Sequence, residues 1–298
     1  MGNHLLVTLV LVSLSACAQS STQNKTESPG IHSCKTVRVQ SVRFDHPSTL
    51  SQADQQAITT DFVGKDFDEQ ADANSEAEQY VRKLYMNRGY FKAKVEASAR
   101  TTQRDGDEVW VELRIRTADE GLQYRLNEIV WANNTAFTGE QLRSLIPLRS
   151  GDVFRRDMIG EGLETIRRAY AAKGYVNFTS VPDTIFDDEN ATIILKVDVD
   201  EGGQFTFAGG AVSGLTPART ESVVSAMASW KDQLYTPTLF PLMFERLRPL
   251  LPPCAGPDRF DGGLRLDDGK HTVSVVLDFE DCFGDGLNSK SSVPIANC

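Results

Sequence analysis

The feature that most constrains this chain is an internal repeat with a period of roughly 85 residues. Gly89-Tyr90 recurs as Gly174-Tyr175, the run GKDF at 64–67 recurs as GDVF at 151–154, and Glu120-Gly121 recurs as Glu201-Gly202. Such a repeat indicates one supersecondary unit that is used several times along the chain. We therefore expect tandem modules.

The order of elements within one copy is clearest in residues 124–202. A strand over residues 124–131 precedes a helix that begins at a capping box formed by Thr138 and Gln141. The next helix carries one apolar stripe, which consists of Ile159, Leu163, Ile166 and Tyr170. That helix ends at Gly174, a residue that can adopt the left-handed conformation that stops a helix.

Two strands complete this copy. The last of them, residues 192–200, alternates strictly, and one of its faces carries Ile193, Leu195, Val197 and Val199. The order strand, helix, helix, strand, strand predicts an α+β fold in which both helices cover one face of a three-stranded mixed sheet.

This segment resembles a POTRA (polypeptide-transport-associated) domain, the periplasmic module of outer-membrane barrel-assembly and two-partner secretion proteins. The resemblance lies in Ile129 and Asn134, in the run 151–154, in Tyr170 with Gly174-Tyr175, and in Glu201-Gly202. It implies tandem βααββ POTRA-like modules that bind proteins without catalysis. It also implies that the fourth element of each module is an edge strand.

We expect the three modules at residues 36–121, 122–203 and 204–282. In the first, the pattern predicts strands over 37–44, 91–99 and 109–116, and helices over 51–63 and from a capping box of Ser75 and Glu78. In the third, it predicts a strand over 204–215, helices over 216–227 and 238–250, and a hairpin over 258–280. This copy diverges because no Gly-Tyr follows its second helix and Pro241 lies near that helix's start.

The first 18 residues have the character of a signal peptide, with a short apolar core over residues 5–14. The run Leu14-Ser15-Ala16-Cys17 resembles a bacterial lipobox, which would make Cys17 the lipidated first residue of the mature chain. Ala16-Cys17-Ala18 also fits ordinary signal-peptidase cleavage, which would discard Cys17. The polar linker over residues 19–35 favours lipidation, and we expect a periplasmic protein that is anchored at the outer membrane if Cys17 is lipidated.

Four further cysteines, Cys34, Cys254, Cys282 and Cys298, indicate disulfides in an exported chain. An Asp-Gly turn is predicted at residues 267–270, and Cys254 and Cys282 each lie 14 positions from Asp268. We therefore predict a Cys254–Cys282 disulfide. Cys34 and Cys298 can pair only if the two chain ends meet.

Other functions are disfavoured. Residues 283–298 form a polar tail with no room for the eight or so membrane strands that a barrel needs, so we expect the modules here without the barrel. The net charge of −10 argues against nucleic acid, whose phosphates need a basic surface. Hydrolase and metalloprotease motifs are absent from the sequence, so we expect no enzyme, no metal and no cofactor.

The predicted function is protein binding in outer-membrane protein assembly or protein transport. An edge strand can accept an extended segment of a barrel protein or an unfolded client, and we place that docking edge at Val176, Asn177, Phe178 and Thr179. Trp110 faces away from the first core and is either a surface anchor for a partner or a packing residue between repeats. The alternative function is a structural envelope scaffold that docks one fixed partner through loops.

Overall fold

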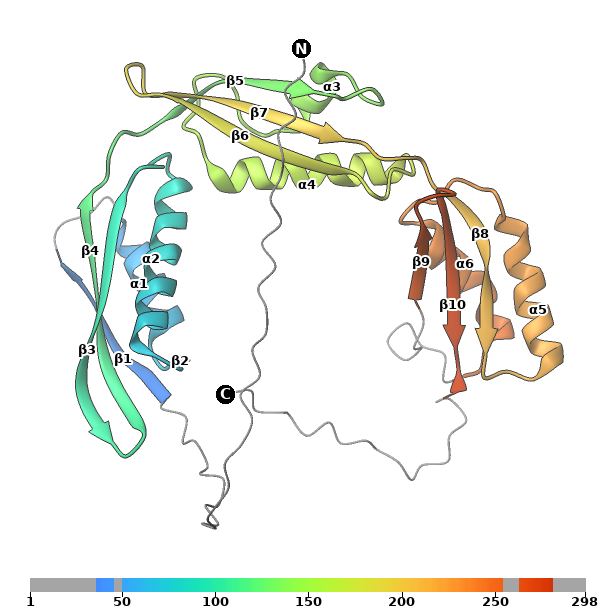
Figure 1. Ribbon diagram of the computed structural model, residues 1–298, viewed down its shortest axis with the longest axis horizontal. Coiled ribbons are helices and arrows are strands. Elements are labelled where there is room, and N and C mark those ends of the chain that lie inside the picture. The colour runs from blue at the N-terminus through green and yellow to red at the C-terminus, as the bar shows by residue number, and fades with distance from the viewer. Residues whose placement is uncertain (1–35, 46–49, 254–262, 281–298) are drawn as a thin grey trace, which may run out of the picture. The chain divides into compact units, whose positions relative to one another are not determined.

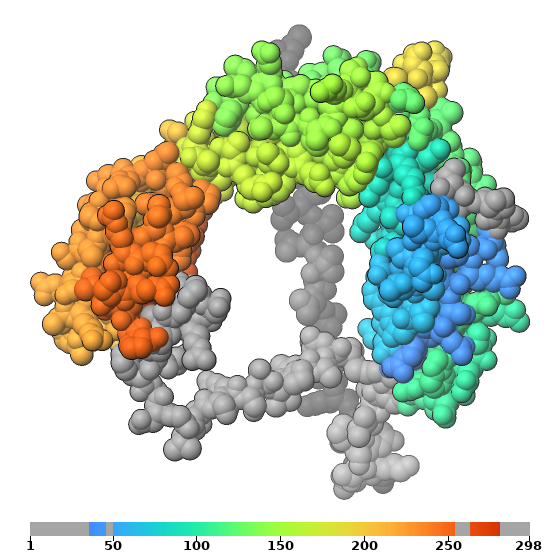
Figure 2. Space-filling model, turned by 180° about the vertical axis from the view of Figure 1, so that it is seen from behind, coloured from blue at the N-terminus to red at the C-terminus, as the bar shows by residue number. Residues whose placement is uncertain are grey.

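The computed structural model describes residues 36–45, 50–253 and 263–280 (Figure 1). Within these residues the chain forms three sheets in sequence order, each accompanied by helices. Each of the three sheets has its own hydrophobic core, and each module is a compact unit in the space-filling view (Figure 2). The tandem α+β architecture predicted from the repeat is confirmed.

The first module contains β1 (Thr36–Asp45), α1 (Gln52–Phe62), β2 (Asp66–Phe67), α2 (Gln70–Met86), β3 (Lys94–Asp105) and β4 (Glu108–Asp119). Its strand order is β2-β1-β4-β3, with β1 parallel to β4 and β3 antiparallel to β4. The two-residue β2 is a fourth strand that the repeat pattern did not predict. It pairs with β1 through Val37 and Arg38, and Arg38 also forms an ion pair with Asp66 at 2.7 Å.

The second module contains β5 (Arg125–Ala132), α3 (Gly139–Ser144), α4 (Arg156–Ala172), β6 (Thr179–Asp187) and β7 (Thr192–Asp200), with strand order β5-β7-β6. Thr138 and Gln141 form the predicted capping box at the start of α3. The helix α4 buries Ile159, Ile166 and Tyr170 under the sheet, while β7 buries its predicted apolar face. Gly174 ends the helical segment with a φ of +84°, as predicted.

The third module contains β8 (Thr206–Ser213), α5 (Pro217–Met227), the 3₁₀ turn η1 (Ala228–Trp230), α6 (Leu239–Leu247), the 3₁₀ turn η2 (Arg248–Leu250), β9 (Gly263–Asp267) and β10 (Thr272–Asp278). Its strand order is β8-β10-β9, so it repeats the parallel central pair and the antiparallel edge. Pro241 lies in the first turn of α6, where a missing N–H leaves no intrahelical bond unmade. The divergent copy therefore keeps the βααββ order.

Two predicted boundaries in the first module were wrong. The helix α2 begins at Gln70, so Ser75 lies in its second turn and forms no capping box with Glu78. Burial of Ala73 against the core extends the helix toward its N-terminus. The strand predicted from residue 91 begins at Lys94, because residues 91 and 92 form a turn.

None of the helices in the described ranges combines the length and the apolar character needed to cross a bilayer.

Candidate functional site: sheet edges and the open face of the second module

The helices cover one face of each sheet, which leaves an edge strand and a helix-free face in every module (Figure 1). The edge strands of the hairpins are β3, β6 and β9. The outer side of an edge strand carries N–H and C=O groups that can pair with another strand. How each edge is satisfied therefore decides where a partner strand can add.

The edge of the first sheet is engaged by its own helix. The backbone N–H of Ala97 in β3 donates to Oε1 of Glu78 in α2 at 3.0 Å. At the first residue of α2, the side-chain amide of Gln70 donates to Oγ1 of Thr101 at 2.8 Å. Since the Ala97 N–H is directed at a helix side chain, it points away from β4. Glu78 therefore already accepts the hydrogen bond that this N–H could otherwise donate to an added strand.

The second sheet carries different residues at the positions equivalent to Ala97 and Glu78. Ala97 lies eight residues after Gly89 and pairs with Ile115, while Pro182 lies eight residues after Gly174 and pairs with Val197. Pro182 therefore occupies the place of Ala97, and proline has no N–H to offer. The residue in the place of Glu78 is Leu163, which has no acceptor group.

A groove runs between α4 and the start of β6. It encloses about 390 Å³ and is lined by Gly160, Leu163, Glu164, Arg167, Phe178, Thr179 and Ser180. Along a strand of an antiparallel pair, the backbone N–H and C=O groups point toward the partner strand at one residue and away from it at the next. Residue 182 is an outward position, so Ser180, two residues earlier, also directs its N–H and C=O away from β7. Ser180 thus presents a backbone donor and acceptor beside an open groove.

The structure corrects the predicted docking edge. Of the four residues predicted, only Thr179 lies in β6, and Val176, Asn177 and Phe178 precede the strand. Phe178 is buried and stacks on Tyr170 with ring centroids 4.1 Å apart, Val176 packs against the third core, and the Asn177 amide bonds to Asp268. These side-chain contacts turn the chain before the sheet ladder begins.

The remaining predicted site residues are placed as follows. Trp110 lies half-buried in β4, opposite Arg38 and Gln103 and on the side of the sheet away from Val109 and Val111. Its predicted role as a surface anchor stays a prediction. Cys17 and the predicted Cys254–Cys282 pair, together with Cys34 and Cys298, lie outside the described residues.

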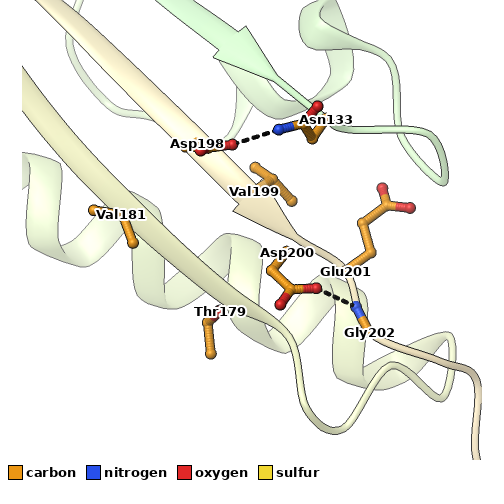
Figure 3. Close-up of a pocket in the computed structure, with 8 residues that line it drawn as sticks. All are labelled: Asn133, Thr179, Val181, Asp198, Val199, Asp200, Glu201 and Gly202. Atoms are coloured by element: carbon orange, nitrogen blue, oxygen red, sulfur yellow. Dashed lines mark hydrogen bonds between the residues drawn. The ribbon is translucent and has the colours of Figure 1, made fainter. Parts of the chain in front are cut away.

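A second hollow lies at the end of β7, on the helix-free side of the second sheet. Figure 3 shows eight residues that line it: Asn133, Thr179, Val181, Asp198, Val199, Asp200, Glu201 and Gly202. Asn133 donates its amide to Asp198 at 2.7 Å, and Asp200 accepts the N–H of Gly202 at 3.1 Å. The hollow is therefore rimmed by carboxylates.

Glu201, the acidic residue of the repeated Glu-Gly motif, joins three parts of the second module. Its carboxylate accepts the N–H groups of Thr135 at 2.6 Å and Ala136 at 2.8 Å, and the hydroxyl of Tyr170 at 2.8 Å. Burial opposes ionisation of Glu201, but the hydrogen bonds from Thr135, Ala136 and Tyr170 outweigh it and lower its pKa to about 2. Burial and the bond to this carboxylate raise the pKa of Tyr170.

The Glu201 carboxylate has a structural role, because its hydrogen bonds to Thr135, Ala136 and Tyr170 hold the loop after β5 and the end of α4 against the end of β7. Across the described ranges, no group of three or more His, Cys, Asp and Glu side chains is arranged to hold a metal ion.

Sequence reasoning missed the residues that control the edges. The sequence places Glu78 in a capping box and Leu163 only on the apolar stripe of its helix, and it gives Pro182 no role. Aligning the first two copies on Gly89 and Gly174 sets Glu78 opposite Leu163 and Ala97 opposite Pro182. The signal was therefore present, but its meaning depends on which backbone groups point outward.

Together, these features define tandem βααββ modules whose sheets each have an edge strand and a helix-free face. A family model described as POTRA, surface antigen variable number repeat, matches residues 124–202. A Treponema pallidum (strain Nichols) protein named as a candidate outer membrane protein assembly factor is 29% identical over 123 residues. That match covers 41% of this chain and 15% of the relative, so the chain spans only a small part of that protein's length.

The fold is also shared with a solved structure. The crystal structure of POTRA domains 3–5 of BamA from Haemophilus influenzae matches 85% of this chain and 99% of its own length, with a TM-score of 0.56 and 22% identity. Residues 124–202 therefore match the POTRA family model, and the described modules share the fold of these BamA POTRA domains.

Proposed function

We propose that this chain is a non-catalytic protein-binding module that acts in outer-membrane protein assembly or protein transport on the periplasmic side of the envelope. The family of residues 124–202 and the name of the Treponema relative support this role. The partner is a barrel protein or an unfolded client polypeptide, whose extended segment adds to a sheet edge. A lipid on Cys17 would tether the modules to the membrane.

We place strand addition at the start of β6. The observation that carries this proposal is the open groove between α4 and the start of β6, beside the outward backbone groups of Ser180. Backbone pairing there would supply directional hydrogen bonds that require little particular sequence. The groove would receive one side chain of the added strand between Gly160 and Leu163.

The test uses a photo-crosslinking amino acid at Arg167, an exposed residue of the groove, in envelopes of cells that carry the full chain. We expect crosslinks to barrel proteins or unfolded clients. The substitution Ser180→Pro removes the outward donor without touching the ladder to β7 and should abolish them. The matched control Ser180→Ala keeps the N–H and should leave them intact.

Two results would contradict this proposal. Crosslinks that survive Ser180→Pro would show that the edge backbone is not used. Crosslinks to one constant envelope protein, equally strong in both variants, would favour the scaffold that docks a fixed partner through loops.

A further inference from the structure

The helix-free face of the second sheet is unusually apolar. The strand register places nine residues on it in three rows: Glu128, Ile194 and Ile185; Val130, Lys196 and Asp183; Ala132, Asp198 and Val181. Val130 and Ile185 are each 40% exposed and Val181 is 66% exposed. Three large apolar side chains thus stand in solvent on one side of a single small sheet.

The first sheet shows that this apolar character is not required by the fold. The residues in the places of Val130, Val181 and Ile185 are Arg43, Glu96 and Arg100. Charges on the first sheet's face form ion pairs, with Arg114 2.7 Å from Glu112 and Arg116 3.6 Å from Glu96. The same fold carries a charged face in one copy and a partly apolar face in the next.

The apolar residues of the second sheet line a real depression. A hollow of about 400 Å³ is bounded by Val130, Ala132, Val181, Asp183, Lys196, Val197 and Asp198. It shares Val181 and Asp198 with the carboxylate-rimmed hollow at the end of β7 (Figure 3). Because they share these two residues, the two hollows follow β6 and β7 as one shallow track lined by both apolar and acidic residues.

The charges around this track are mainly negative. Glu128, Asp183 and Asp198 lie on the face and Asp200 lies at its end, against Lys196, the one cation among the nine residues of the three rows. An apolar surface bordered by carboxylates suits a segment that offers apolar side chains between basic ones. An acidic or purely apolar segment would leave the carboxylates unpaired or repelled.

We infer that the helix-free face of the second sheet is a docking surface for a basic, amphipathic protein segment, separate from the strand-accepting edge of β6. The apolar side chains of that segment would cover Val130, Val181 and Ile185. Its Lys or Arg side chains would meet Asp183, Asp198 and Asp200. Binding at this surface does not use backbone pairing, so it can be tested separately from the proposed strand addition.

The probe is a labelled peptide with alternating Leu and Lys, compared with the same peptide carrying Glu in place of Lys. Fluorescence anisotropy with the full chain should show at least tenfold tighter binding of the Leu/Lys peptide. Methyl resonances of Val130, Val181 and Ile185 should shift on its addition. Binding should weaken as salt is raised.

The double variant Val130→Arg, Ile185→Arg installs the residues of the first sheet at the equivalent positions and should weaken Leu/Lys binding at least tenfold. The control Val224→Arg changes an exposed apolar residue of α5 and should leave it unchanged. Ser180→Pro should also leave it unchanged, which separates this face from the edge.

Three results would overturn the inference. Equal affinity for the two peptides would remove the electrostatic argument, and methyl shifts elsewhere would place the peptide on another surface. Concentration-dependent self-association that the double variant abolishes would show that a second copy of the chain is the occupant.

Discussion

Glu78 accepts the backbone N–H of Ala97 at 3.0 Å, and this bond joins the edge strand of the first sheet to the helix beside it. At the equivalent place in the second sheet, Pro182 removes the N–H altogether and Leu163 replaces the carboxylate. Two chemically different devices therefore remove the same outward donor. Natural sheets limit unwanted edge pairing with charges and prolines of this kind.

The first prediction concerns Glu78. Glu78→Ala should free the Ala97 N–H, raise the exchange rate of that amide about tenfold and cost about 1 kcal/mol of unfolding free energy, the usual net value of one hydrogen bond. NMR-detected hydrogen exchange and urea denaturation measure both effects. Glu78→Gln keeps an acceptor and should restore protection. Equal exchange in all three proteins would mean that the carboxylate does not hold this donor.

The second prediction concerns Pro182. Pro182→Ala restores an outward N–H in the middle of β6 and should promote pairing between the edge strands of two molecules. Sedimentation experiments should then show concentration-dependent association of the chain. It should also lower stability by about 0.4–1 kcal/mol, because the unfolded chain gains conformational freedom. Val181→Ala adds no donor and should remain as monomeric as the parent. A monomeric Pro182→Ala variant would argue that the edge is protected in another way.

The third prediction concerns pH. The folded pKa of Glu201 is about 2 against an ordinary value of 4.5, so the unfolded chain binds the proton more readily. The stability that this group contributes is complete above about pH 4.5 and falls as the pH decreases toward 2. Denaturation at pH 7 should show Glu201→Gln to be less stable by about 1–2 kcal/mol once solvent screening is allowed for, with the difference shrinking at pH 3.

The control for this pH prediction is Glu161→Gln, an exposed residue of α4, which should change stability little at either pH. A Glu201→Gln deficit that stays constant from pH 7 to pH 3 would show that its cause is not ionisation of the carboxylate.

The fourth prediction uses two glycines of α4. An added Cβ at Gly162 would clash with Cδ1 of buried Ile146 and would lie 3.0 Å from its Cα, whereas one at Gly160 would meet nothing within 4 Å. Gly162→Ala should therefore destabilise the module by about 1–3 kcal/mol through overpacking. Gly160→Ala should stabilise it by about 0.5–1 kcal/mol, because alanine is the better helix former. Thermal unfolding compares the stabilities of the two variants. A stabilising Gly162→Ala would mean that the segment around Ile146 moves to make room for the added methyl group.

Much of the fold was predictable because its signals are local. Gly174 ends α4 with a φ of +84°, and the strict alternation of β7 matches its buried face. Tyr175 packs on Tyr170 with ring centroids 5.7 Å apart, and Tyr90 packs on Tyr85 with ring centroids 6.1 Å apart, so the aromatic residue of the repeated Gly-Tyr motif contacts the preceding helix in both copies. Each of these features depends on a period or on a residue's own conformational preference.

The misplaced features depend on contacts between distant residues. Ser75 and Glu78 have the spacing of a capping box, but burial of Ala73 carries α2 back to Gln70 and leaves Glu78 free to reach Ala97. Val176 to Phe178 look like the start of a strand, but stacking of Phe178 on Tyr170 delays the strand to Thr179. Neither competing contact can be read from the local pattern.

The sequence by itself determined the repeated βααββ order, the helix ends and the inward face of each closing strand, because periodicity and glycine conformation are properties of short segments. Only the tertiary structure decided which backbone donors point outward and which side chains share the bare face of the second sheet. Those properties arise from register across three strands and from helix side chains that reach the edge. Physical proximity between Glu78 and Ala97, or between Val130 and Val181, exists only once the module has folded.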